Sequence, residues 1–149
     1  MKKLTLLFLI TQFCQNLAFS YTTLDEIDLI HSKTAQCINE TFSKKGDLIN
    51  CTREGIKKYD SEIKKTLTEA KTNLEINQYN QLLKTQKSWE NYLINFSKLY
   101  TISKDNFLNK HEFDLYYYQN GYDLYKERIT ELSIFLNNSK VFLNSCKKY

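Results

Sequence analysis

Proline is absent from this 149-residue chain, and glycine occurs only three times, at Gly46, Gly55 and Gly121. These two residue types most readily end a helix or open a tight turn. A chain with so few of them has little to interrupt long helices. The composition therefore favours an all-α fold.

Arginine and histidine are also scarce, and only Arg53, Arg128, His31 and His111 represent them. The formal net charge is +4. Lysine alternates with Glu and Asp as on solvated helix faces, which argues against a nucleic-acid partner. No nucleophile elbow, phosphate-binding loop or His-Glu-x-x-His sequence occurs, so we predict a protein that is not an enzyme and needs no cofactor.

Two groupings of acidic residues with a histidine resemble fragments of a metal site. Asp25, Asp28 and His31 recur at steps of three, and Glu112 follows His111 directly. The first turn of a helix favours acidic residues through its dipole, and neither histidine has a second histidine at a ligand spacing. We therefore predict no metal site.

Outside the first twenty residues the chain has no long hydrophobic run. Lys2 and Lys3 precede an apolar stretch from Leu4 to Phe13, and Ala18 and Ser20 place small residues at the positions that signal peptidase reads. This pattern predicts a signal peptide over residues 1–20, followed by a single domain over 21–149 without a transmembrane segment. The expected location is periplasmic or secreted.

Two apolar stripes with helical spacing occupy the middle of the chain. The first includes Ile56, Ile63 and Leu74, and the second runs from Leu82 to Tyr100, with Asp47 and Asn77 as the expected helix caps. Two stripes of equal length joined by a few residues bury each other best as an antiparallel hairpin. We predict a small helical bundle built around this long hairpin.

The flanking segments complete the predicted bundle with two or three further helices. A shorter stripe runs from Leu24 to Ile38, and a last one includes Leu124, Ile129 and Leu136. Residues 103–120 are less periodic, and Asn120-Gly121 is a turn signal there. The expected fold has four or five helices.

Three cysteines follow the predicted leader: Cys37, Cys51 and Cys146. Export favours a disulfide, and Cys37 and Cys51 lie on either side of one predicted helix–helix corner. We expect their α-carbons to lie within about 7 Å of each other. Cys146 is then left over, either free or in an intermolecular bond.

The densest aromatic run is Tyr116-Tyr117-Tyr118, between the hairpin and the last helix. Tyrosine rings pack against a thin helical core, but three neighbouring residues on a helix cannot all face inward. At least one should project outward, and exposed tyrosine is a preferred anchor for protein or sugar contacts. These three residues are the candidate binding surface.

Gln86, Trp89 and Tyr92 give the pattern Gln-x-x-Trp-x-x-Tyr after a leucine pair. This resembles the signature of the LprI-type lysozyme-inhibitor family. The likeness spans about residues 37–135 and also includes Cys37, Thr41, Cys51, Tyr59-Asp60, Arg128, Thr130 and Leu132.

The chain departs from the family at three places. Leu93-Ile94 stands where the family typically has Arg-Asp, Ser97 stands at a family cysteine, and the fourth family cysteine is missing. Joint loss of two cysteines implies that these two pair with each other, which leaves Cys37–Cys51 as the remaining bridge. Loss of the Arg-Asp pair implies that the fold is kept more securely than the inhibitory activity.

The resemblance implies an exported bacterial protein of the cell envelope that binds a partner and protects peptidoglycan from lysozyme. Its partner would be lysozyme or another envelope protein. In that setting Gln86, Trp89 and Tyr92 form a structural signature, and we expect Trp89 in the core and the Gln86 amide hydrogen-bonded across the helices. The alternative is a periplasmic structural or partner-binding module with no inhibitory activity.

Overall fold

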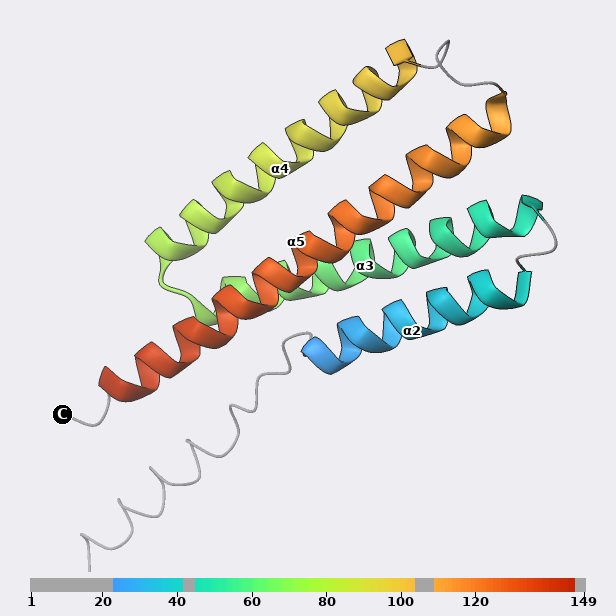
Figure 1. Cartoon of the computed structure of the whole chain (residues 1–149). Helices are drawn as coiled ribbons and strands as arrows, with labels where there is room; N and C mark the ends of the chain where they lie inside the picture. Colours follow the sequence, from blue (N-terminus) through green and yellow to red (C-terminus); the bar gives the residue numbers. More distant parts are fainter. Residues whose placement is uncertain (1–22, 42–44, 104–108, 147–149) are drawn as a thin grey trace, which may run out of the picture.

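The computed structural model describes residues 23–41, 45–103 and 109–146, and this part of the chain forms four helices (Figure 1). They are α2 (Leu24–Thr41), α3 (Lys45–Asn73), α4 (Ile76–Ser103) and α5 (Lys110–Cys146). No strand occurs among the described residues, so the predicted all-α class is confirmed. The predicted leader, residues 1–20, lies outside the described part.

At the starts of α2 and α5, side chains bind free backbone N–H groups. At α2, Thr23 and Glu26 form a reciprocal capping box, with Glu26 N donating to Thr23 Oγ1 at 3.2 Å and Thr23 N donating to Glu26 Oε2 at 2.8 Å. At α5, the Asn109 carboxamide oxygen accepts from Glu112 N at 2.9 Å. Asn109 is therefore the N-cap of α5.

Two predicted caps were wrong. Helix α3 begins at Lys45, before Asp47. Helix α4 begins at Ile76, where the N–H of Glu75 donates to Gln78 Oε1 at 3.3 Å, so Glu75 occupies the cap position instead of Asn77. The side chain of Gln78, three residues after the cap, thus satisfies the Glu75 N–H, as one half of a capping box does.

Helix α5 is continuous through Asn120-Gly121, so the predicted turn there was also wrong. The Asn120 side-chain amide donates to the carbonyl oxygen of Tyr116, one turn back in the same helix, at 2.7 Å. Gly121 faces Ile56 of α3, and its φ is not positive. Asn120-Gly121 fits within the helix because the Asn120 amide hydrogen-bonds a backbone carbonyl of the same helix.

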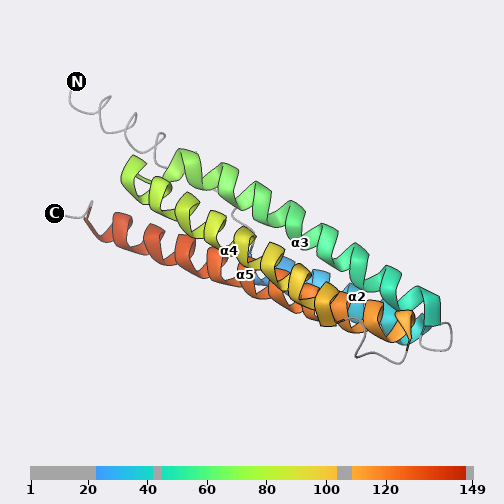
Figure 2. The ribbon, with the colours of Figure 1, turned by 90° about the horizontal axis from the view of Figure 1, so that it is seen from above.

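Helices α3 and α4 form the predicted hairpin, joined by Leu74 and Glu75, and Figure 1 shows them diverging from this turn. Seen from above, the two helices run alongside each other (Figure 2). The closest neighbours of α3 are α5 and α2, and the backbone of α4 lies farther from the other helices. Toward the open end of the hairpin, α5 lies between α3 and α4 (Figure 1). The core of the bundle therefore lies mainly between α3 and α5, and not within the α3–α4 hairpin alone.

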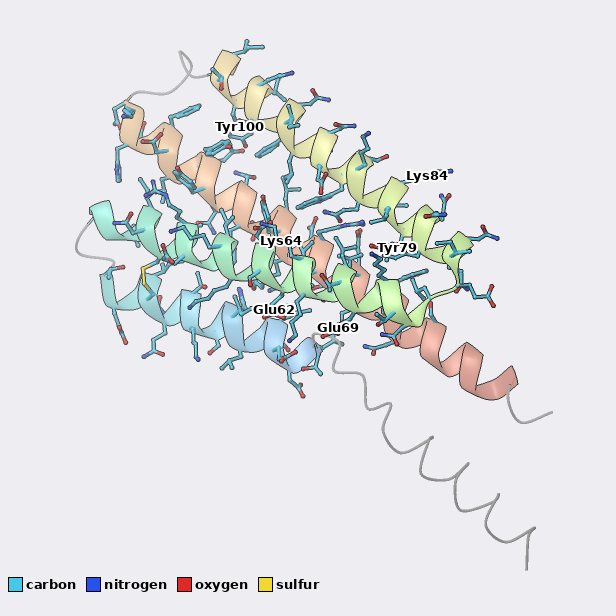
Figure 3. The ribbon with its side chains drawn as sticks, turned by 180° about the vertical axis from the view of Figure 1, so that it is seen from behind. Glu62, Lys64, Glu69, Tyr79, Lys84 and Tyr100 are labelled. Atoms are coloured by element: carbon cyan, nitrogen blue, oxygen red, sulfur yellow. A yellow bond between two sulfur atoms is a disulfide. The ribbon has the colours of Figure 1, made fainter. Side chains whose placement is uncertain are left out.

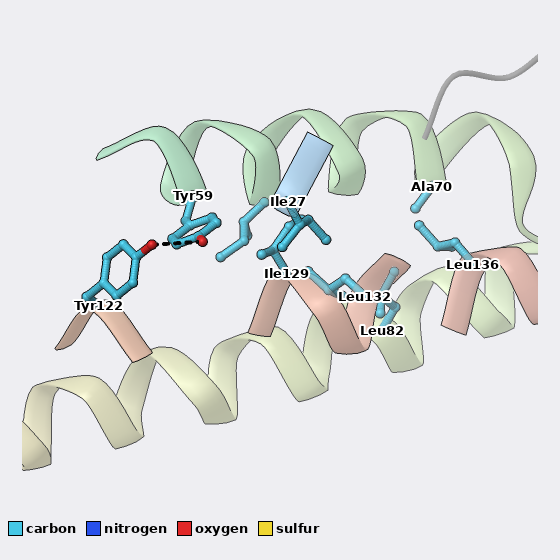
Figure 4. Packing of buried hydrophobic residues seen from close by; sticks show 9 residues of the cluster. Ile27, Tyr59, Ala70, Leu82, Tyr122, Ile129, Leu132 and Leu136 are labelled. Atoms are coloured by element: carbon cyan, nitrogen blue, oxygen red, sulfur yellow. Dashed lines mark hydrogen bonds between the residues drawn. The ribbon is translucent and has the colours of Figure 1, made fainter. Parts of the chain in front are cut away.

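The core is a row of apolar side chains between α3 and α5, with one contribution each from α2 and α4 (Figure 4). Its buried members are Ile27, Tyr59, Ile63, Ala70, Leu82, Tyr122, Ile129, Leu132 and Leu136. Small polar residues, Thr34, Thr52, Thr66 and Ser133, are buried as well. The threonines at 34 and 52 each donate to the carbonyl four residues back, which satisfies their hydroxyls inside the helix pair.

Cys37 of α2 and Cys51 of α3 form a disulfide, with their α-carbons 5.8 Å apart. This confirms the pairing predicted from the helix–helix corner. Thr41, at the last turn of α2, donates to the Cys37 carbonyl at 2.7 Å. The side chain of Cys146 lies outside the described residues. Along the described ranges, none of the helices combines the length and apolar character needed to cross a membrane.

Candidate functional site

The end of the molecule where α4 finishes and α5 begins carries a layer of aromatic rings. We call it the aromatic end, and it consists of Tyr92, Phe96, Tyr100, Phe113, Tyr116, Tyr117 and Tyr118. Tyr100 lies between the two helices there (Figure 3). Its ring centroid is 4.4 Å from that of Phe96 and 5.5 Å from that of Tyr116. Burial and a hydrogen bond with Tyr116 raise the pKa of Tyr100 to about 12.

The three predicted tyrosines have different environments. Tyr117 is half-buried, and its hydroxyl donates to Ser97 Oγ of α4 at 3.2 Å. Tyr118 accepts from Arg53 Nη2 of α3 at 3.2 Å, and the guanidinium carbon lies 4.8 Å from its ring centroid. Tyr116 alone of the three is exposed, at 52 % of its surface. All three therefore contact a neighbouring helix, and Tyr116 alone of them also projects outward.

Tyr92, predicted only as part of the structural signature, is a second exposed ring at this end. It is 51 % exposed, and its ring centroid lies 6.3 Å from that of Phe96. Exposed apolar side chains of α4 accompany it, Leu99 and Ile102. Each of Tyr92 and Tyr116 contacts a neighbouring ring although half of it faces solvent, which restricts the side chain and lowers the entropy lost on binding.

A groove of about 560 Å³ lies in the opening between α3 and α4. Its apolar surface comes from Ile63, Leu67, Trp89, Leu93, Ile94 and Tyr125, and charged side chains line it as well. Trp89 meets the ring of Tyr125 edge-on, with centroids 5.1 Å apart and planes at 84°. The prediction that Trp89 is a core residue needs correction. It is half-buried against the core because α4 diverges from α3.

Gln86 connects α4 to α5 by hydrogen bonds, as the sequence predicted. Its carboxamide oxygen accepts from Arg128 Nε at 3.0 Å, and its amide nitrogen donates to Glu90 Oε1 at 3.1 Å. Arg128 also donates from Nη2 to Thr85 Oγ1 at 3.3 Å and from Nη1 to Glu131 Oε2 at 3.2 Å. A polar chain from Glu90 through Gln86 to Arg128 thus runs beneath α4.

A second buried polar chain links α2, α3 and α5. The hydroxyls of Tyr59 and Tyr122 lie 3.1 Å apart, and the Tyr122 hydroxyl lies 3.0 Å from His31 Nδ1. Burial raises the pKa of Tyr59, and the hydrogen bond with Tyr122 raises it further. His31 thus packs against this network, and no cluster of three metal-binding side chains occurs within residues 23–41, 45–103 and 109–146.

Sequence reasoning identified Gln86, Trp89 and the tyrosine run but missed Arg128 as a central residue. The structure shows it buried, with hydrogen bonds to two residues of α4. Two features of the sequence could have indicated this role. Arg128 immediately precedes Ile129 in the apolar stripe of the last helix, and it is one of only two arginines in the chain.

No family model, no curated protein and no solved structure matches the chain. The likeness to the LprI-type family therefore depends on the residues quoted above.

Proposed function

We propose that this chain is a binding protein of a bacterial cell envelope that holds a protein partner at its aromatic end and performs no catalysis. The observation that carries the proposal is the pair of exposed but packed rings, Tyr92 and Tyr116. Tyrosine is a frequent anchor of protein interfaces because it offers a large ring and a hydroxyl with few rotatable bonds. The leader-like residues 1–20 support export to the periplasm or the medium.

Lysozyme is the partner that the family resemblance implies, and it is the first to test. An inhibitor needs a rigid projection that fits the target's glycan cleft, and no chemistry of its own. Leu93 and Ile94, which replace the family's charged pair, line the groove between α3 and α4. The aromatic end is built from other residues, so it can serve a target without that pair.

The test is calorimetric titration of a c-type lysozyme with the mature chain, residues 21–149, beside an assay of cell-wall lysis. We expect measurable binding but weak or no slowing of lysis, because Leu93-Ile94 stands where the family typically has Arg-Asp. The double variant Tyr92→Ala, Tyr116→Ala should bind at least tenfold more weakly, because each anchor typically contributes about 2 kcal/mol. Leu83→Ala is the control, since Leu83 is an exposed apolar residue of α4 outside this end.

Two results would contradict this assignment in different ways. Binding that the double variant retains in full would show that the partner contacts another surface. If lysozyme does not bind at concentrations up to about 100 μM, the binding free energy is weaker than about −5.5 kcal/mol, and lysozyme is rejected as the partner. The second result leaves the alternative, a partner-binding module without inhibitory activity.

A further inference from the structure

An open pocket of about 570 Å³ lies between the first half of α4 and the second half of α5, away from the aromatic end. This volume lies within the range of small-molecule sites. Leu82, Leu132 and Phe135 provide its apolar surface. Its polar lining comes from Asn77, Gln78, Gln81, Thr85, Arg128, Glu131 and Ser139. The pocket thus combines an apolar wall with one arginine and several amide groups.

Arg128 is the unusual member of this lining because it is only 8 % exposed. A guanidinium has five N–H donors. Three of its hydrogen bonds are accounted for, by Gln86, Thr85 and Glu131. The described residues leave two N–H donors of a buried cation for a further acceptor.

The carboxylate that pairs with Arg128 offsets little of the free-energy cost of burying its charge. Glu131 forms the ion pair at 3.2 Å, yet its side chain is 68 % exposed. The other nearby carboxylate, Glu90, hydrogen-bonds Gln86. A buried charge is costly without a well-placed counter-charge, whereas an ion pair with an exposed partner contributes little. A ligand anion that displaces Glu131 into solvent would supply that counter-charge.

We propose that this pocket binds a monocarboxylate with an apolar body, with the carboxylate on Arg128 and the body against Leu82, Leu132 and Phe135. The planar guanidinium fork matches a carboxylate through two parallel N–H···O bonds. Glu131 at the rim repels an anion, and it repels a phosphate dianion more strongly than a singly charged carboxylate. This site is independent of the aromatic end, so either can fail without the other.

Trp89 provides the readout, because it is the only tryptophan and the Arg128 guanidinium carbon lies 6.0 Å from its ring centroid. The mature chain is titrated with octanoate, octanamide and acetate while Trp89 fluorescence is recorded. We expect saturable binding of octanoate. Octanamide, which lacks the charge, and acetate, which lacks the apolar body, should each bind at least tenfold more weakly.

Three variants locate the site, and circular dichroism confirms that each is folded. Arg128→Lys keeps the charge but loses the fork, and should weaken octanoate binding at least tenfold. Glu131→Gln removes the competing carboxylate and should strengthen binding severalfold. Arg53→Lys is the matched control, because Arg53 lies on α3 beside Tyr118 and should leave binding unchanged.

The proposal is overturned if octanoate does not bind up to 10 mM, if octanamide or acetate binds as well as octanoate, or if Arg53→Lys weakens binding as much as Arg128→Lys does. Unchanged or weaker affinity in Glu131→Gln also overturns it. This last variant changes an exposed residue, so it decides the question even if Arg128→Lys fails to fold.

Discussion

Gly55 lies where three helices approach one another. A β-carbon built on it would be 2.5 Å from Tyr122 Cε2 of α5 and 2.8 Å from Thr34 Oγ1 of α2. The Tyr122 ring cannot move freely, because its hydroxyl contacts both Tyr59 and His31. Gly55 is therefore required by close packing, since its φ is not positive.

Substitution of Gly55 and of Gly121 should have opposite effects. Gly55→Ala should lower the free energy of unfolding by about 1–3 kcal/mol, the usual range for overpacking. Gly121→Ala is the matched control, because its β-carbon would lie 3.5 Å from Ile56 Cδ1, an ordinary contact. It should raise stability by about 0.5–1 kcal/mol through helix propensity. Urea unfolding measures both, and equal effects of the two changes would contradict the packing argument.

Tyr59 should make the fold sensitive to alkaline pH. Burial raises its pKa in the folded protein, whereas an unfolded tyrosine ionises near pH 10. Below pH 10 both states keep the proton, so the contribution to stability is fully present. Above pH 10 only the unfolded state releases it, and the free energy of unfolding falls by up to about 1.4 kcal/mol per pH unit.

The measurement is urea unfolding of the wild type and Tyr59→Phe between pH 8 and 11. The wild type should lose stability more steeply above pH 10, because the phenylalanine variant has no proton to release at this position. Tyr122 keeps its hydrogen bond to His31 in the variant. Parallel curves for the two proteins would show that Tyr59 ionises normally in the fold.

At the scale of the elements, α2 is the helix most dependent on covalent attachment. It buries only Ile27 and Thr34, and the disulfide joins its last turns to the start of α3. The double variant Cys37→Ala, Cys51→Ala should lose about 3 kcal/mol, the chain-entropy value for a loop of about fifteen residues. Urea unfolding and limited proteolysis of α2 are the measurements.

Cys146→Ala is the control for this prediction, since it leaves the Cys37–Cys51 bridge in place. Reduction of the wild type with dithiothreitol should reproduce the double variant. An unchanged midpoint in the double variant would show that packing of α2 alone secures the corner.

The sequence predicted the elements well where apolar periodicity was strong and less well where it was weak. Stripes of aliphatic residues identified α2, α3 and α4 because burial enforces helical spacing. The exact start of α4 and the continuity of α5 through Asn120 each involve a side-chain hydrogen bond that spacing does not reveal. Helix boundaries therefore depend on local partners.

The site was less predictable than the fold, because it depends on how the helices diverge. The stripe that contains Trp89 indicated burial, and the opening between α3 and α4 made this side chain half-buried instead. A run of three tyrosines indicated that one would project, but which one depends on Arg53 and Ser97, from two other helices. The pocket at Arg128 required knowledge of the α4–α5 contact.

For the whole molecule, the position of the core determines when it can form. The apolar row joins Tyr59, Ile63 and Ala70 of α3 to side chains of α5 that lie more than fifty residues later in the sequence (Figure 4). A chain emerging from the ribosome, or entering another compartment N-terminus first, can close the α2–α3 corner early but leaves this face of α3 uncovered until α5 follows. Until nearly the whole chain is available, we therefore expect chaperones to bind the exposed apolar face of α3 in the nascent protein.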